Sequence, residues 1–142
     1  MILAVNPYLS FNGTCEAAFN HYKSVFGKEF DMVGRYKDIP GAEIPESEKE
    51  KIMHISMMLT EHVCLMGSDT SEAFGQTTTI GCCVAITLCT ETEEETRRIF
   101  DGLADGGKAT MPLEETFWAK LYGVCTDRFG ITWAINFGMK EF

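Results

Sequence analysis

The chain of 142 residues lacks any long uninterrupted run of apolar residues. A membrane-spanning helix needs roughly 18 or more of them. The N-terminal residues 1–7 also lack the basic region and the length of a signal peptide. We therefore expect a protein with no membrane partner, located in the cytoplasm.

Positive charge is scarce as well. Twelve Lys and Arg residues stand against 21 Asp and Glu residues, which gives a formal net charge of −9. Nucleic-acid-binding proteins need clustered Lys and Arg to neutralise phosphates, so nucleic acid is not an expected partner. The acidic segments 43–50 and 91–95 are typical of a solvated loop and a helix start, although an acidic groove for a cationic ligand stays open.

The six cysteines lack the C-x-x-C spacing of a zinc knuckle or a thioredoxin-like redox centre. Most of them stand in apolar runs such as 63–66 and 82–86. A free cysteine in such a run behaves as a small buried hydrophobe, and no base that could activate a thiol stands nearby in the sequence. We interpret the cysteines as reduced and as core residues.

What the chain does contain is the 45% hydrophobic content of one ordinary globular domain. In its first half, the apolar spacing from Cys15 to Phe26 predicts a helix that begins after Thr14 and ends at Gly27. Strands are predicted at 8–11, 30–37, 52–59 and 63–67, with a long surface loop at 38–51.

The second half repeats the first at an offset of about 77 residues. A strand is predicted at 82–88, a helix after a capping box formed by Thr90 and Glu93, and a final hairpin from 119–125 and 131–137. Each half then has the order β-α-β-β-β. Since the sheet of one such unit cannot bury its apolar face alone, we expect a single α+β domain over residues 1–142, with modules at about 1–70 and 80–142 pairing around a cleft.

Several segments resemble one known family over nearly the whole chain. The most specific are Glu115-Thr116-Phe117-Trp118 and the segment 126–133, and further matching segments are 7–13, 22–27, 35–40, 52–54 and 65–69. They are similar to the PhnB-like branch of the vicinal-oxygen-chelate superfamily, which includes glyoxalases, bleomycin-resistance proteins and dioxygenases. The resemblance implies a glyoxalase-like curved mixed sheet around a cleft.

Metal-dependent members of that superfamily hold a divalent cation through His and Glu side chains on four strands. The resemblance puts these positions on residues that are neither histidine nor carboxylate: Pro7, Leu65 or Met66, Cys82 or Val84, and Ala134. A divalent cation in such a cleft needs oxygen or imidazole donors, and apolar side chains cannot substitute for them. We therefore expect no metal site and no cofactor, and metal-dependent glyoxalase or dioxygenase activity is disfavoured.

The best candidate wall for a pocket is aromatic, with Trp118, Phe117 and Tyr122 as ligand-binding residues and Glu115 to orient the ligand. Packing in the core or a dimer is the alternative for the aromatics, and capping of the loop is the alternative for Glu115. Met66 and Trp133 complete the ligand-binding candidates, although Trp133 and Asn136 have opposite parity, so at most one of them can line a cleft.

Three functions stay open. The first is a glyoxalase/bleomycin-resistance-like protein that binds a small molecule in an aromatic cleft without a conventional metal site. The second is a lyase or isomerase in which Glu115 or His54 is the catalytic base, which requires a raised carboxylate pKa or a well-placed imidazole. The third is a metal-dependent glyoxalase or dioxygenase. His54 also fits a core or sheet-face position.

Members of the PhnB-like branch, which this sequence resembles, are also labelled as demethylubiquinone methyltransferases. Binding of S-adenosylmethionine normally calls for a Gly-rich strand-to-helix turn, which this sequence lacks. We further expect a homodimer, because each module would expose sheet edges and superfamily members of this length commonly pair.

Overall fold

The computed structural model describes residues 1–140 of the chain. The chain divides into two compact units, Met1–Thr79 and Ile80–Phe142. Each unit has the predicted order of strand, helix and three strands. The described residues contain no helix that is both long enough and apolar enough to span a membrane.

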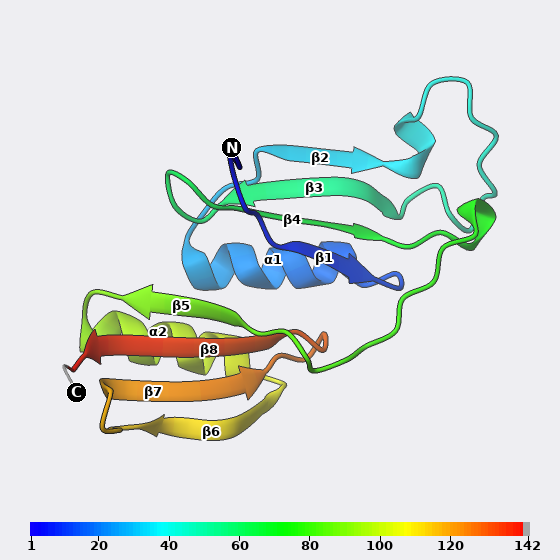
Figure 1. The fold of residues 1–142 in the computed structure, drawn as a ribbon. Coiled ribbons are helices and arrows are strands. Elements are labelled where there is room, and N and C mark those ends of the chain that lie inside the picture. The colour runs from blue at the N-terminus through cyan, green and yellow to red at the C-terminus, as the bar shows by residue number, and fades with distance from the viewer. Residues whose placement is uncertain (141–142) are drawn as a thin grey trace. The chain divides into compact units, whose positions relative to one another are not determined.

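The first unit is a four-stranded sheet with one helix on it. Its elements are β1 (Tyr8–Phe11), α1 (Cys15–Phe26), β2 (Met32–Arg35), β3 (Ile52–Met58) and β4 (Cys64–Asp69). The strand order is β1-β4-β3-β2, in which β1 runs parallel to β4 and the other pairs are antiparallel. Helix α1 lies along one face of this sheet (Figure 1).

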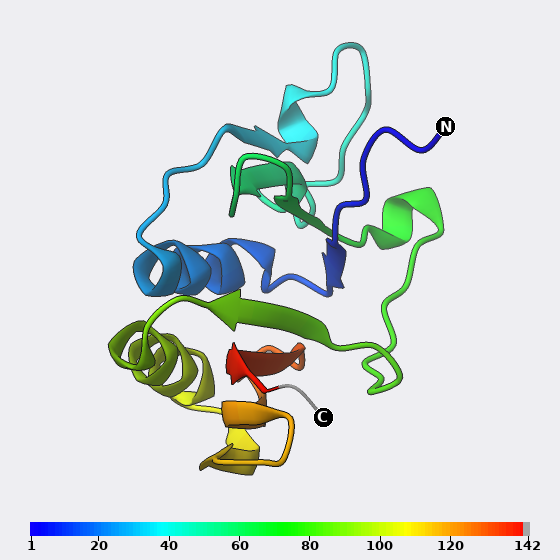
Figure 2. The ribbon, with the colours of Figure 1, turned by 60° about the vertical axis from the view of Figure 1, so that its left-hand side comes forward.

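The second unit repeats this arrangement. Its elements are β5 (Ile86–Thr90), α2 (Glu93–Ala104), β6 (Lys108–Glu114), β7 (Ala119–Thr126) and β8 (Thr132–Met139). The strand order β5-β8-β7-β6 matches that of the first unit position by position, with a parallel β5–β8 pair. Helix α2 again lies on one face of its own sheet (Figure 2). The α+β class and the internal repeat are therefore confirmed.

Alternation along the strands divides each sheet into a helix-facing side and an open side. In the first unit, Leu9, Phe11 and Leu65 are buried on the helix-facing side. Gly67 lies on that side too, where a Cβ atom would stand 2.7 Å from the Phe19 ring. The helix-facing side of this sheet is therefore the core of the unit, and the residues between these positions lie on the open side.

One buried carboxylate, that of Asp69, fixes the loops at two strand ends. Asp69 is 2% exposed, and its oxygens accept hydrogen bonds from the amides of Gly13, Cys15 and Ile52, each at 2.9 Å. The helix start, the end of β4 and the start of β3 are thereby joined at one carboxylate. A carboxylate suits this position because the helix N-terminus carries partial positive charge and unpaired amides.

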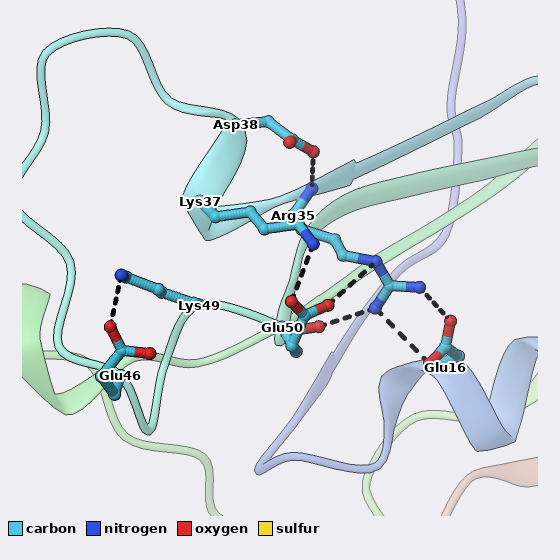
Figure 3. Close-up of polar contacts among 7 residues, drawn as sticks. All are labelled: Glu16, Arg35, Lys37, Asp38, Glu46, Lys49 and Glu50. Atoms are coloured by element: carbon cyan, nitrogen blue, oxygen red, sulfur yellow. Dashed lines mark hydrogen bonds and ion pairs between the residues drawn. The ribbon is translucent and has the colours of Figure 1, made fainter.

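The loop between β2 and β3 is held by surface ion pairs (Figure 3). Arg35 pairs with Glu16 on α1 and donates to the carbonyl oxygen of Glu50 at 2.7 Å. Lys37 contacts the Glu50 carboxylate at 2.7 Å, and this hydrogen bond lowers the pKa of Glu50. The predicted surface loop is thus present, and it follows a 3-10 turn at Tyr36–Asp38.

Two local predictions at β5 and α2 are wrong. The strand begins at Ile86 rather than Cys82, and it continues through Thr90, which pairs with Phe137 on β8. Because Thr90 belongs to the sheet, the helix cap lies two residues later, at Thr92, whose hydroxyl accepts from the Glu95 amide at 3.1 Å. The internal repeat predicts a strand between α2 and β7, which is β6, but it does not give the residues at which that strand begins and ends.

The prediction that the cysteines are core residues holds for two of the six. Cys15 and Cys125 are buried, and burial raises the pKa of both thiols, that of Cys125 to about 11. Cys64 is half-buried, whereas Cys82, Cys83 and Cys89 are exposed. Cys82 and Cys83 precede β5 in an irregular segment, so the apolar run around them is not a buried strand.

Candidate functional site

The predicted aromatic residues of the second unit form one cluster beside the β6–β7 hairpin. The rings of Phe117 and Trp118 meet edge to face, with centroids 4.9 Å apart. Trp118 also contacts Tyr122 on β7, with centroids 5.2 Å apart and an interplanar angle of 68°. Phe117 is 71% exposed, and Trp118 and Tyr122 are partly exposed. The cluster offers apolar surface that the unit itself does not bury.

The turn that presents this cluster depends on Thr116, a residue not predicted as functional. Its hydroxyl accepts from the amides of Trp118 at 3.3 Å and Ala119 at 3.0 Å, and its own amide donates to the Ala119 carbonyl oxygen. Threonine commonly closes turns in this way, and its position before Phe117 and Trp118 was the available signal. Glu115 does not cap the loop; Thr116 does.

Glu115 is exposed beside the cluster and forms an ion pair with Lys140. The hydrogen bond from Lys140 is the main cause of a lowered pKa for Glu115. A general base near neutral pH needs the opposite shift, because a carboxylate with a lowered pKa holds a proton poorly. The ion pair therefore favours an orienting role for Glu115 over a basic one.

Register places Asn136 next to the cluster, on the open side of the sheet. Asn136 pairs with Tyr122 on β7 and with Cys89 on β5, so these three side chains form a row across three strands. Residues directly opposite each other on neighbouring antiparallel strands lie close together on the same side. The sequence indicates only that Asn136 and Trp133 have opposite parity on their strand.

Trp133 lies on the helix-facing side and is fully buried. Its indole nitrogen donates to Asp127 at 2.8 Å, and the same carboxylate accepts from the amides of Phe129 and Ile131. Asp127 thus closes its own turn through side-chain hydrogen bonds to the backbone. Trp133 therefore belongs to the core and does not adjoin the aromatic cluster.

The other two predicted site residues, His54 and Met66, belong to the first unit. His54 is half-buried on β3, and its Nδ1 lies 3.3 Å from the Tyr8 hydroxyl. Met66 on β4 pairs with Ser56 and with Tyr8, which places it on the open side of that sheet. The open side of the first sheet is thus polar at His54 and Ser56 and apolar at Met66.

A surface depression of about 420 Å³ lies elsewhere in the first unit. It is lined by residues from the α1–β2 connection, the end of β3 and the β3–β4 turn, namely Lys28, Glu29, Asp31, Met58, Leu59, Thr60 and Glu61. Glu29 is paired with Lys23, and Asp31 accepts from the Met58 amide. The depression includes none of the predicted site residues, and its acidic groups already have partners within the fold.

The residues at the positions of the superfamily's metal ligands do not fit a metal ion. Pro7, Met66 and Ala134 provide no oxygen or imidazole donor from their side chains. Within residues 1–140, no group of three or more His, Cys, Asp or Glu side chains is arranged to hold a metal. Metal-dependent chemistry therefore has no ligand set at these positions.

Comparison with known proteins identifies the family. The family model described as 3-demethylubiquinone-9 3-methyltransferase matches residues 4–136. Protein YjdN of Escherichia coli (strain K12) is 34% identical, over 94% of this chain and 95% of its own length.

Solved structures agree with this match. Protein PA1353 from Pseudomonas aeruginosa is 36% identical, with a TM-score of 0.84 over 98% of this chain and 100% of that chain. A PhnB protein from Bacillus cereus is 25% identical, with a TM-score of 0.76 over 94% and 98%. A glyoxylase/bleomycin resistance protein/dioxygenase domain from Frankia sp. EAN1pec shares the fold, with a TM-score of 0.65 over 100% and 94% at 12% identity.

The match covers nearly the whole chain, and the relatives are covered almost in full. The chain belongs to the family described as 3-demethylubiquinone-9 3-methyltransferase, and it shares the fold of a glyoxylase/bleomycin resistance protein/dioxygenase domain.

Proposed function

We propose that this protein binds a small planar molecule on the aromatic cluster of its second unit, without using a metal. The observation that carries the proposal is the position of Phe117, Trp118 and Tyr122, which are in mutual contact yet partly exposed beside a charged pair. Aromatic walls with a few polar groups are the usual composition of small-molecule sites.

We propose a binding role for Glu115 and not a catalytic one. The contact with Lys140 lowers the pKa of the Glu115 carboxylate, whereas a general base needs a raised pKa. Methyl transfer, the activity in the family's description, is not proposed for this chain. The connection between β1 and α1 is Asn12-Gly13-Thr14, which is not the Gly-rich turn that commonly holds the nucleoside of S-adenosylmethionine. His54 and Met66 on the open side of the first sheet are proposed as further ligand-binding residues. We also propose that residues 1–142 are one domain.

Indole is a suitable first probe, and the protein's two tryptophans report on it by NMR. In ¹⁵N-labelled protein, we expect unlabelled indole to shift the side-chain N–H resonance of Trp118 and to leave that of buried Trp133 in place. Trp118→Ala lacks the reporting resonance, so its affinity is measured by isothermal titration calorimetry, and it should be at least about tenfold weaker, as for the aromatic anchor of an interface. Glu115→Gln should cause a smaller loss, without unfolding the chain.

Phe74→Ala is the matched control, because Phe74 is an exposed aromatic residue of the first unit outside the cluster. It should leave the affinity for indole unchanged. The proposal is wrong in its location if Trp118→Ala and Glu115→Gln bind indole normally while His54→Ala abolishes binding.

We also propose that the protein is a cytoplasmic homodimer. Each sheet has two unpaired edge strands, β1 and β2 in the first and β5 and β6 in the second. Met32 and Val33 on β2 and Met111 on β6 are exposed apolar residues at such edges, where association with a second chain is favourable. Static light scattering at micromolar concentration should give twice the 15.9 kDa of one chain, and a mass of 15.9 kDa would contradict the dimer.

A further inference from the structure

Asn136 carries a buried polar group that the fold does not satisfy. The residue is 9% exposed, and its Oδ1 accepts no hydrogen bond from any group within residues 1–140. Its Nδ2 donates to the Met139 sulfur at 2.8 Å. A reversed amide would turn its oxygen toward the thioether sulfur, which has no hydrogen to donate, and would leave the nitrogen without an acceptor. The orientation with Nδ2 toward Met139 is therefore the better one, and Oδ1 is the atom without a partner.

Stability of the second unit does not explain this residue. A buried polar atom without a partner destabilises a fold, whereas an apolar residue of similar size would avoid the loss. The two preceding positions on β8 are Ala134 and Ile135, both buried and apolar. A buried residue that lowers stability in this way is typical of a functional site.

The place of Asn136 connects it to the aromatic cluster. It stands opposite Tyr122 in the β7–β8 pair, and Tyr122 contacts Trp118. The side chain of Met139, which contacts its amide nitrogen, is 64% exposed and can move aside through its flexible thioether chain. Movement of Met139 would open the amide to a ligand that lies on Trp118 and Tyr122.

We infer that Asn136 determines specificity at this site by accepting a hydrogen bond from the ligand, and that the ligand class is a planar aromatic compound with a ring N–H or O–H group. The inference rests on the proposed function. An aromatic ring alone would gain its affinity from the cluster, and the donor group would add the hydrogen bond that Oδ1 lacks. A ligand without the donor would leave that oxygen unpaired.

Indole and 1-methylindole test this directly, because they differ in the ring N–H that the methyl group replaces. Titrations followed through the Trp118 resonance should show indole binding roughly tenfold more tightly, although the added methyl group makes 1-methylindole more apolar. In Asn136→Leu the two affinities should become equal. That variant should also keep or raise the Tm, because it removes an unsatisfied polar group.

Asn20→Leu is the control, since Asn20 is exposed on α1, and the variant should keep the roughly tenfold preference. Equal affinities of the native protein for the two compounds would overturn the assignment and leave the proposed function standing. If neither compound shifts the Trp118 resonance, both proposals fail. A lowered Tm in Asn136→Leu would show that Asn136 has a structural role instead. A retained preference for indole in that variant would show that another group accepts the ring N–H, and it would overturn the assignment.

Discussion

Asp69→Ala should lower the free energy of unfolding by about 3–5 kcal/mol, because it leaves buried amides without an acceptor. In the native chain, Asp69 accepts from Gly13, Cys15 and Ile52 at one 2%-exposed carboxylate. Urea unfolding followed by far-UV circular dichroism measures the loss.

The control for this substitution is Asp101→Ala on the exposed surface of α2, which should change stability by no more than about 0.5 kcal/mol. Asp69→Asn should fall between the two, because the amide keeps one oxygen and turns its NH₂ group toward a donor. A loss below about 1 kcal/mol for Asp69→Ala would mean that the three amides find other partners.

The same experiment tests whether residues 1–142 unfold as one domain. Both tryptophans, Trp118 and Trp133, lie in the second unit, whereas Asp69 lies in the first. If the units are coupled as proposed, Asp69→Ala should shift the tryptophan fluorescence transition together with the circular dichroism transition. A fluorescence transition that stays in place would show that the second unit unfolds independently.

Gly67→Ala should destabilise the first unit by about 3 kcal/mol, at the upper end for an overpacked core. A Cβ atom at residue 67 would stand 2.7 Å from the Phe19 ring and 2.9 Å from the Leu9 carbonyl oxygen. Both groups are fixed, one by α1 and the other by the β1–β4 pairing, so neither can move away without cost. The midpoint of urea unfolding reports the change.

Gly81→Ala is the matched control, because a Cβ atom there meets no atom within 4 Å and the backbone needs no left-handed conformation. It should be neutral within about 0.5 kcal/mol. A Gly67→Ala chain as stable as the control would show that α1 can shift away from β4. The Phe19 ring would then not require a glycine at residue 67.

The two faces of the second sheet differ in how far their polar groups are satisfied. Trp133 and Asp127 satisfy each other on the helix-facing side, which stabilises the β7–β8 turn. On the open side, Trp118 stays partly exposed and Asn136 stays unsatisfied. A site that must exchange solvent for a ligand needs such unsatisfied groups, since a fully satisfied surface gains little from binding.

The sequence alone determined the family, the order of elements and the two-fold repeat. These follow from local signals: the apolar spacing of Cys15 to Phe26, the glycine stop at Gly27, and the matching pattern about 77 residues later. The parity argument also held, because Trp133 and Asn136 must point to opposite sides of any strand that contains both.

Tertiary structure decided which polar groups meet and which stay alone. Glu115 and Lys140 are far apart in the sequence, and so are Asp69 and the three amides that it accepts from. The start of β5 and the exposure of Cys82 and Cys83 were likewise decided by strand pairing with β8. Local patterns report on propensity and periodicity, whereas hydrogen-bond partners and burial depend on contacts that only the folded chain creates.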